Sequence, residues 1–497
     1  MSTYHLLTNL PELAVEFQDV IKLFLPDARV SLGGGDKVIW HEHTESGGIY
    51  TEDWRFAEWE NAVSAPAETD KVRIKRIIKR AAKTGLYQLM RRVTGVRPPW
   101  GSLTGIRPTR LMYEAIDNGL MQEAAEWHMR SAFDVDSVRA ALLAEILSMQ
   151  REWIHPGEGE FDIYIGIPFC TTRCDYCSFS SGEVGNGALV GPYVDALIRE
   201  MEGAAALVGT GGRTVRAAYV GGGTPTSIDP GALRRVIEAA QRLFPGAKEW
   251  TVEAGRPDTI SEGHLAMFKE LGITRISVNP QTFSDETLRT IGRKHTGAQT
   301  VQAYALARQM GFDHINMDLI CALPGESEED FDNSLRRAIA LNPESITVHT
   351  LAIKHGSKLN ERGHQQIASL AAQSMVDNAR EVLMAAGYRP YYLYRQKYMA
   401  GNLENVGYAK PGRQCIYNID IMEETTPILA MGAGAITKWL FDRQMRIERA
   451  PNVKNIEQYI RRVDEMIARK RAVIEGGEWP AQSDELGEAG HDKDKGE

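Results

Sequence analysis

Short apolar runs alternate with amphipathic stretches through the middle of the chain, from residue 161 to residue 350. The runs FDIYIGI (161–167) and VRAAYVG (215–221) are apolar at most positions, which is typical of parallel strands buried on both faces. Stretches between them, such as GALRRVIEAAQRLF (231–244), repeat apolar residues every three or four positions, as amphipathic helices do. The predicted strands are 161–167, 215–221, 249–254, 273–279, 314–320 and 345–350.

Six strands that alternate with helices predict an α/β fold with six βα units and a parallel sheet. We expect an open or incomplete barrel rather than a doubly wound sheet, although periodicity alone does not separate the two. Both architectures place the active site at the carboxyl ends of the strands. The predicted core domain spans residues 156–360.

The unusual residues of this region follow the predicted strands. Three cysteines come after the first strand and the sequence GGGTPT (221–226) comes after the second. Glu253 ends the third strand, Gln281 follows the fourth, and Asp318 lies at the end of the fifth. Five such coincidences in register are hard to obtain from packing alone, so the sequence predicts one site at this edge of the sheet.

Cys170, Cys174 and Cys177 form a Cys-x3-Cys-x2-Cys loop. Soft thiolates suit an iron–sulfur cluster or zinc. A structural zinc site needs a fourth ligand, and the loop offers no further Cys or His. Three thiolates on a four-iron cluster leave one iron open to a small molecule. Buried structural cysteines are the plain alternative, and they are what we expect of Cys321 and Cys415.

Composition excludes several classes of protein. A chain of 497 residues is long enough for about two or three domains. Five cysteines, three of them clustered, do not make a disulfide framework. No run of about 18 apolar residues occurs, so no membrane span is expected. The first residues lack the basic and apolar regions of a signal peptide, so we expect a cytoplasmic protein.

The stretch GIPFCTTRCDYCSFSS (166–181), followed by GGGTPT, resembles the radical S-adenosylmethionine (SAM) superfamily and, within it, the oxygen-independent coproporphyrinogen III oxidase group. The likeness is strong over 160–350 and looser through MGAGAITKW (431–439). It implies a partial (β/α)6 radical SAM barrel and a [4Fe-4S] cluster on the three cysteines. The open iron would bind the amine and carboxylate of SAM, and one electron would cleave SAM to a 5′-deoxyadenosyl radical.

Other residues would complete the SAM site. Gly222 and Gly223 remove side chains where backbone must approach a ligand, and Thr224 adds a hydroxyl, although such a turn can simply join a strand to a helix. The resemblance places Tyr164 beside the sulfonium, as the one candidate catalytic residue, and matches Arg293 to the SAM carboxylate. A structural role is the alternative for each. The predicted cofactor-binding set is Gly222, Gly223, Thr224, Glu253, Gln281, Arg293, Asp318, Ile320 and Ala352, the last two as apolar contacts to adenine.

Residues 1–155 are predicted to form an α+β extension, with strands in VIWHEH (38–43) and GIYTEDWRF (48–56). A basic amphipathic helix follows at 71–93, and twelve Lys or Arg without any Asp or Glu lie between residues 71 and 110. This arrangement resembles the HemZ-type branch of the group, often called coproporphyrinogen dehydrogenase. The basic face would steer a carboxylate-rich substrate or bind RNA. A solvated helix face is the plainer interpretation, and nucleic acid is not the expected partner.

The chain after the core is predicted to form a substrate-side domain over 361–473 that closes with one amphipathic helix at 453–473. Seven of the seventeen tyrosines lie in 388–417. Such residues suit either a flat macrocycle or an ordinary sheet. The acidic residues 474–497 bury too little apolar surface to fold, so we expect a disordered tail. The cations that would accompany the tyrosines are Arg389, Arg395, Lys397, Lys410 and Arg413.

The resemblance implies a radical SAM oxidoreductase of haem and porphyrin biosynthesis, a coproporphyrinogen III dehydrogenase. It would convert two propionates of coproporphyrinogen III to vinyl groups, giving protoporphyrinogen IX, with a flavodoxin or ferredoxin as reductant. Some true oxidases have a further cysteine after the triad, whereas this chain has Ser178 and Phe179. That ending also fits a related branch of haem chaperones without oxidase activity. A radical SAM enzyme that acts on RNA or degrades haem is a further alternative.

Overall fold

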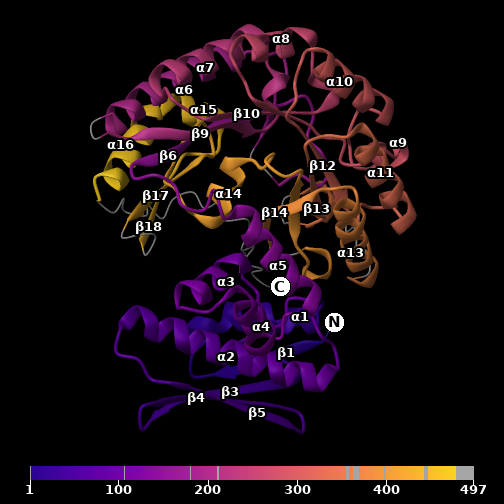
Figure 1. Ribbon diagram of the computed structural model, residues 1–497. Coiled ribbons are helices and arrows are strands. Elements are labelled where there is room, and N and C mark those ends of the chain that lie inside the picture. Colours follow the sequence, from indigo (N-terminus) through magenta and orange to yellow (C-terminus); the bar gives the residue numbers. More distant parts are fainter. Residues whose placement is uncertain are drawn as a thin grey trace, which may run out of the picture.

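An open eleven-stranded sheet is the frame of the molecule, and it curves in an arc with helices on its outer side (Figure 1). The computed structural model describes residues 2–105, 107–178, 181–209, 212–353, 357–361, 369–396, 399–441 and 446–476. The strand order is β14-β15-β13-β12-β11-β10-β9-β6-β16-β17-β18. Because β14 and β18 are the two free edges, the described sheet has an open side.

All six predicted strands are present and pair in parallel in chain order. The predicted α/β fold with a partial (β/α)6 barrel is confirmed. The strands are β6 (Glu160–Ile167), β9 (Thr214–Gly222), β10 (Glu249–Gly255), β11 (Arg275–Val278), β12 (Ile315–Cys321) and β13 (Ser345–Thr350).

The chain after residue 361 extends the same sheet at both edges. On one side β16 pairs in parallel with β6, and antiparallel β17 and β18 follow. On the other side β15 pairs antiparallel with β13, and β14 with β15. The predicted substrate-side region therefore shares backbone hydrogen bonds with the core. These elements are β14 (Arg389–Tyr394), β15 (Asn405–Ala409), β16 (Ile428–Met431), β17 (Ile436–Phe441) and β18 (Arg446–Pro451).

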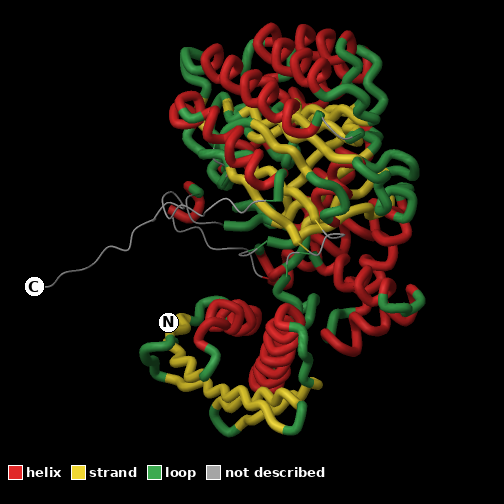
Figure 2. The backbone as a smooth tube through the Cα atoms, turned by 90° about the vertical axis from the view of Figure 1, so that its left-hand side faces the viewer, coloured by secondary structure: helices red, strands yellow, loops and turns green. Residues whose placement is uncertain are grey.

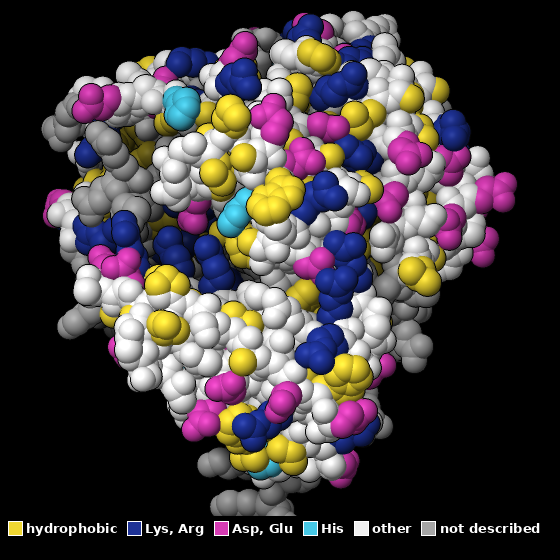
Figure 3. Space-filling view, turned by 60° about the horizontal axis from the view of Figure 1, so that its bottom comes forward, with side chains coloured by type: hydrophobic (Ala, Val, Ile, Leu, Met, Phe, Trp, Pro, Cys, Tyr) yellow, Lys and Arg dark blue, Asp and Glu magenta, His cyan; other side chains and the backbone are white. Residues whose placement is uncertain are grey.

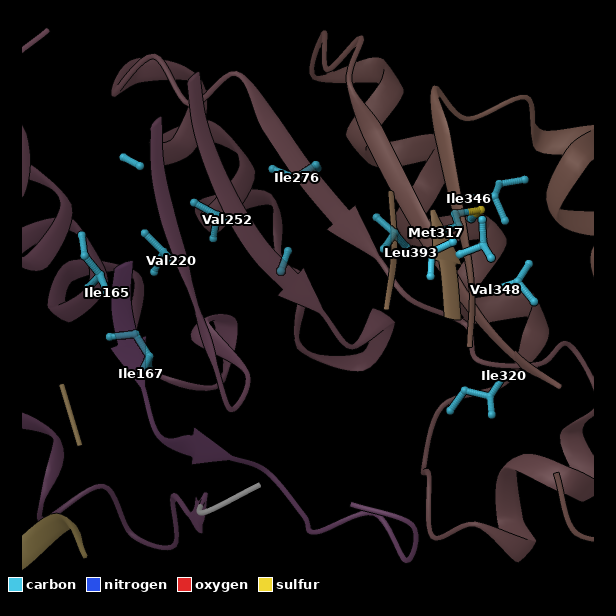
Figure 4. Packing of buried hydrophobic residues seen from close by; sticks show 14 of the residues in the cluster. Ile165, Ile167, Val220, Val252, Ile276, Met317, Ile320, Ile346, Val348 and Leu393 are labelled. Atoms are coloured by element: carbon cyan, nitrogen blue, oxygen red, sulfur yellow. The ribbon is translucent and has the colours of Figure 1, made fainter. Parts of the chain in front are cut away.

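Helices pack on the outside of the sheet because each buries one apolar stripe. In α7, Pro230 occupies the first turn and the Asp229 side chain accepts hydrogen bonds from two free amides, which fixes where the helix starts. Figure 4 shows Ile165, Val220 and Val252 side by side on successive strands of the buried core. The outer helices are α6 (Val190–Val208), α7 (Pro230–Leu243), α8 (Glu262–Glu270), α9 (Asp285–Thr290), α10 (Gly297–Gln309), α11 (Glu328–Leu341) and α13 (Ser369–Ala385).

The predicted single helix over 453–473 is wrong, because the chain forms two helices that break at Arg462. These are α15 (Ile456–Arg461) and α16 (Val463–Ile474), and the φ and ψ of Arg462 are −115° and 22°. The break allows side chains from both helices to reach one acceptor, Glu200 of α6. Tyr459 donates to Oε2 of Glu200 at 2.5 Å, and Lys470 donates to Oε1 at 2.6 Å.

The N-terminal part has its own sheet, in the order β2-β1-β3-β4-β5, which two helices cover on one face (Figure 2). The two predicted strands and the basic helix are all present. Ala82 and Leu86 of the basic helix are buried against Trp54 of the sheet in a separate apolar core. The elements are β1 (Thr3–Thr8), α1 (Ala14–Phe24), β2 (Arg29–Ser31), β3 (Lys37–Ser46), β4 (Ile49–Phe56), β5 (Trp59–Pro66) and α2 (Lys71–Thr94).

Residues 100–150 pack against the barrel rather than against the N-terminal sheet. Trp100, Met112 and Leu143 belong to the same apolar cluster as the barrel strands. The side chain of Trp100 also donates to Oε2 of Glu404 at 2.6 Å. The three helices of this segment are α3 (Pro108–Asp117), α4 (Gln122–Phe133) and α5 (Ser137–Gln150).

None of the described helices is both long enough and apolar enough to cross a membrane. The structure describes residues only as far as 476, so nearly all of the predicted acidic tail (474–497) lies outside the described residues.

The buried pair between Lys470 and Glu200 predicts a large stability effect. Both side chains are 0% exposed, so replacing Lys470 with Met leaves the Glu200 carboxylate buried without its cation. We expect Lys470→Met to lower the free energy of unfolding by about 3–5 kcal/mol in denaturant titrations. The neighbouring Arg471 is exposed, so Arg471→Met should cost less than about 0.5 kcal/mol. Equal losses in the two variants would contradict this account.

Candidate active site

One cavity of about 560 Å³ lies at the carboxyl ends of the barrel strands, and all thirteen residues proposed from the sequence line it. They come from separate strands and loops, and only the parallel sheet brings them together. The roles assigned to them stay predictions. These residues are Tyr164, Cys170, Cys174, Cys177, Gly222, Gly223, Thr224, Glu253, Gln281, Arg293, Asp318, Ile320 and Ala352.

The thiol loop is held by two buried arginines. Arg256 donates to the hydroxyl of Thr172 at 2.7 Å, and Arg293 donates to the hydroxyl of Tyr176 at 2.9 Å. A second nitrogen of Arg293 bonds the carbonyl of Asn279 at 3.2 Å, after β11. Arg293, proposed to bind the SAM carboxylate, therefore also fastens the loop to the barrel.

The three thiols of Cys170, Cys174 and Cys177 line the cavity, and Thr224 donates to the Sγ of Cys170 at 3.6 Å. Within the described part of the chain, no three His, Cys, Asp or Glu side chains form a group that could hold one metal ion. An iron–sulfur cluster does not require such a group, because each thiolate binds a different iron. Three soft donors at a cavity wall therefore fit a cluster, and they do not form a mononuclear zinc site in this structure.

The glycine loop approaches the thiol loop closely. Gly223 donates to the carbonyl of Ile167 at 2.8 Å, and Thr224 donates to the carbonyl of Phe169 at 2.7 Å. A Cβ on Gly223 would lie 2.5 Å from the Phe169 oxygen, so no other residue fits there. Gly222 has φ +109°, a conformation that favours glycine. Packing therefore requires glycine at 223, and the backbone conformation favours it at 222, whatever else this loop binds.

Glu253 lies beside Tyr219, which donates to its Oε1 at 2.5 Å. Burial and the nearby Asp318 carboxylate together raise the pKa of Glu253 to about 7, against the lowering effect of the Tyr219 hydrogen bond. A Cβ on Gly221 would lie 2.8 Å from the Glu253 Oε2, so a side chain at this position would have to displace the carboxyl group. The cavity therefore contains a carboxyl group that titrates near neutral pH.

Asp318 belongs to a polar network that sequence reasoning missed. Asn316 donates to it at 2.7 Å, His349 Nε2 lies 3.7 Å from it, and Tyr394 contacts the other ring nitrogen of His349 at 3.3 Å. Burial opposes ionisation, but these bonds hold the pKa of Asp318 below its usual value. The sequence signal that could have revealed this network lies in β13. Side chains alternate along a strand, so Thr347 and His349, two residues apart, point to the same face, and both line the cavity.

The adjoining wall positions Gln281 and the two apolar candidates. Gln281 has φ +68° and exchanges backbone hydrogen bonds with Asp318 and Ile320, so its side chain is held beside β12. Ile320 is 6% exposed, and Ala352 pairs with Met399 just beyond β13. Aliphatic packing and ligand contact are both compatible with these positions.

A stack of tyrosines forms a further wall. Tyr219 and Tyr417 stack with ring centroids 4.5 Å apart, and Tyr164 lies 6.3 Å from each of them. On β14, the rings of Tyr392 and Tyr394 are nearly parallel, with an interplanar angle of 4°. Tyr219 was not proposed from the sequence, although it shares the inner face of β9 with Gly221. These rings provide a flat, largely apolar surface.

The cations proposed to accompany the tyrosines do not line the cavity. Arg395 is buried and donates to the backbone of Leu103 and Asn402, and Lys410 bonds Asn342. Arg389 bonds backbone carbonyls at the end of α13, and Arg413 lies 3.9 Å from Asp313. The four described side chains do not serve the cavity because each is engaged by other partners, three of them by backbone or amide oxygens and one by a carboxylate. Lys397 lies outside the described residues.

Comparisons with known proteins agree with this geometry. The sequence model described as the radical SAM superfamily matches residues 164–338. The chain is 37% identical over 477 residues to the oxygen-independent coproporphyrinogen-III oxidase-like protein HemZ of Bacillus subtilis, covering 92% of this chain and 95% of that protein. It is 30% identical to the heme chaperone HemW of Escherichia coli over 56% of this chain and 70% of HemW.

Among solved structures, the coproporphyrinogen III oxidase HemN of Escherichia coli has a TM-score of 0.52 at 24% identity, covering 65% of this chain and 72% of HemN, which shows a shared fold. The protein is a member of the radical SAM superfamily. Within it, the chain belongs to the family of the coproporphyrinogen-III oxidase-like protein HemZ. The superfamily uses a [4Fe-4S] cluster with SAM, and Cys170, Cys174 and Cys177 fit its cysteine motif.

The thiol loop yields a prediction about iron content. After anaerobic reconstitution with iron and sulfide, Cys174→Ser should lose most of the iron bound per chain. Cys321→Ala and Cys415→Ala should keep it, because both thiols are buried and neither lines the cavity. Iron and acid-labile sulfide are measured for each variant. Comparable iron in Cys174→Ser and wild type would refute the assignment.

Glu253 yields a prediction about pH. Its pKa is higher in the folded than in the unfolded chain, so the folded state loses stability as pH rises from about 4.5 to 7. The cost at pH 8 is on the order of 3 kcal/mol, and Glu253→Gln should remove it. Urea titrations of the cofactor-free protein at pH 5 and pH 8 measure the effect. The free energy of unfolding of Glu253→Gln, relative to that of wild type, should be higher at pH 8 than at pH 5. The same difference between variant and wild type at both pH values would contradict the assignment.

Proposed function

We propose that this protein is a radical SAM coproporphyrinogen III dehydrogenase, which oxidatively decarboxylates two propionate side chains to vinyl groups. The observation that carries the proposal is the match to HemZ along nearly its whole length. Less than a tenth of this chain is left out of that match, so it must include most of the N-terminal 155 residues. The proposed dehydrogenase activity is based on the similarity to HemZ and HemN, and the shape and lining of the cavity support it.

The cavity is suited to a flat ligand with a dry reactive edge. Its volume lies within the range of small-molecule sites. The stacked rings of Tyr164, Tyr219 and Tyr417 offer a planar surface to a macrocycle. Glu253 and Asp318 offer acceptors at the strand ends for the hydroxyls and ammonium of a cofactor.

When bound, the cluster and SAM supply the one-electron chemistry that removes a hydrogen atom from the propionate carbon next to the macrocycle. The chain's own residues hold the thiol loop through Arg256 and Arg293 and line the reactive space with rings that exclude water. Loss of CO2 from the resulting substrate radical, with transfer of its one remaining unpaired electron to a separate one-electron acceptor, would complete each vinyl group. A reductant protein, flavodoxin or ferredoxin, is proposed as the electron source.

A haem chaperone function is the second candidate, and HemW relatives favour it. Two thirds or more of Escherichia coli HemW is matched at 30% identity. The same tyrosine-lined cavity would suit an intact haem. The two functions differ in chemistry, because a chaperone binds and transfers haem without loss of propionates.

The experiment compares both ligands on one reconstituted preparation. With SAM, a reductant and coproporphyrinogen III under anaerobic conditions, we expect 5′-deoxyadenosine together with a product that has lost two carboxyl groups, detected by mass spectrometry. The Cys174→Ser protein is the control and should give neither product.

Haem is offered to the same preparation in parallel. Stoichiometric haem binding and transfer, with coproporphyrinogen recovered intact, would assign the chaperone function instead. No product and no haem binding would reject both functions.

A further inference from the structure

Asp318, His349 and Tyr394 form a polar set that faces the cavity from three different strands. His349 Nε2 lies 3.7 Å from Oδ2 of Asp318, and the Tyr394 hydroxyl lies 3.3 Å from Nδ1 of His349. All three residues line the cavity. They come from β12, β13 and β14, which lie close together at one side of the arc in Figure 1. We call them the His349 set.

His349 faces the cavity rather than the apolar core. Every other residue of β13 is buried, whereas the side chain of His349 is 25% exposed. On the face of the molecule shown in Figure 3, exposed histidines stand singly among other side chains. His349 differs from such surface histidines because both of its ring nitrogens have a polar neighbour that lines the same cavity.

His349 is the main group that keeps Asp318 ionised. Burial alone would raise the pKa of Asp318, yet this pKa lies below its usual value, because His349 and, more weakly, Asn316 and Thr347 favour the carboxylate. Asn316 donates to Oδ1 of Asp318 at 2.7 Å, so His349 and Asn316 approach different oxygens. The charge on Asp318 therefore depends on a neighbouring strand.

The second carboxylate oxygen of Asp318 is suited to bind a ligand. Its distance of 3.7 Å from His349 is longer than a hydrogen bond, so the contact is electrostatic. It stabilises the negative charge and leaves Oδ2 able to accept a hydrogen bond. The backbone of Asp318 is fixed as well, because its amide bonds the Asn279 side chain and its carbonyl accepts from Gln281. A charged acceptor on a rigid strand binds hydroxyl or ammonium donors well.

Tyr394 fixes the protonation pattern of the His349 ring. Burial and the nearby Asp318 carboxylate raise the pKa of Tyr394, so its hydroxyl keeps its proton at neutral pH. When the imidazole is neutral, this hydroxyl can donate to Nδ1, which leaves the ring proton on Nε2. When the imidazole is charged, Nε2 carries a proton as well. In both states His349 therefore turns an N–H toward Asp318.

The His349 set lies beside the residues that were predicted to contact the adenine of SAM. Ile320 is opposite His349 in the parallel register of β12 and β13, and it follows Asp318 by two residues on the same face. Ala352 follows β13 by two residues and lines the same cavity. The ribose of SAM is bonded directly to adenine, so this place favours the ribose hydroxyls as the donors to Asp318.

We propose that His349 is a positioning residue of the cofactor site: it holds the Asp318 carboxylate charged and oriented to accept hydrogen bonds from the ribose hydroxyls of SAM. This inference goes beyond the proposed function and does not depend on which tetrapyrrole is bound, because the chain belongs to a superfamily that uses SAM. Asp318 touches the cofactor, and His349 acts through it.

The test measures the affinity of the reconstituted full-length protein for SAM by equilibrium dialysis, without reductant, so that no cleavage occurs. His349→Phe keeps a ring but has no N–H, and His349→Gln keeps an N–H donor. His43→Gln is the matched control, because His43 Nδ1 lies 2.8 Å from the Glu52 carboxylate in the N-terminal sheet, outside the cavity lining. The iron bound per chain shows whether the thiol loop of each variant is intact.

We expect His349→Phe to weaken SAM binding about fivefold to twentyfold, because the charge on Asp318 loses its main support. His349→Gln should weaken it less than about threefold, and His43→Gln less than about twofold. In an Asp318→Asn background, His349→Phe should cause less than about a twofold further change, because the carboxylate through which it acts is absent. A merely structural role of His349 would give the same loss in both backgrounds.

Two fragments of SAM identify the donor. 5′-Deoxyadenosine has the ribose hydroxyls but no ammonium group, and methionine has the ammonium group but no ribose. His349→Phe should weaken binding of 5′-deoxyadenosine about as much as that of SAM, and should change methionine binding less than about twofold.

Three results would overturn the inference: unchanged SAM affinity in His349→Phe, an equal loss in the Asp318→Asn background, or a loss for methionine rather than for 5′-deoxyadenosine. If His349→Phe does not retain iron, Tyr394→Phe replaces it, with an expected loss of about twofold to fivefold, and unchanged affinity there also overturns the inference. Absence of decarboxylated product would overturn the proposed dehydrogenase function and leave these binding results as they are.

Discussion

The close contact between the first two loops of the barrel is the constraint on which the site depends. β6 and β9 pair in parallel, so that Ile167 lies opposite Gly222. Their register continues into the hydrogen bonds from Gly223 and Thr224 to the backbone of the thiol loop. Those bonds form only if the second loop lacks side chains at its tightest points. The thiols, the glycines and the strand-end carboxyls are therefore placed by one backbone arrangement.

Helix α14 (Ile416–Glu423) connects this site to the N-terminal segment. Tyr417 at its start stacks in the cavity wall, while Glu423 at its end accepts bonds from Thr109 and Gln150. A helix fixed at both ends cannot shift without disturbing the cavity. The N-terminal region therefore helps to fix the position of one wall of the cavity. A dehydrogenase and a haem chaperone would both use this wall, and they would differ in what happens to the carboxylates of the bound ring.

Buried polar groups tie the free edges of the open sheet to the barrel. Glu200 on α6 bonds Lys470 and Tyr459, and its neighbour Asn452 follows β18. On the other edge, Arg139 lies against Glu404, just before β15. Each pair is satisfied only when distant segments meet, so these contacts specify how the chain closes around the cavity.

The sequence by itself determined the strands, the thiol loop and the thirteen cavity residues, because apolar periodicity and unusual residues at strand ends are local signals that a parallel sheet turns into one site. It also predicted the basic helix, whose apolar stripe is likewise local. Only the tertiary structure revealed the His349–Asp318 network, the place of Tyr219 and the break at Arg462, since each depends on partners far along the chain. The same reason explains why the sequence left open whether the cations of 388–417 serve a ligand or a sheet. It also explains why Arg107, Lys438 and Arg449, which span more than 340 residues, meet at Glu424 only in the folded protein.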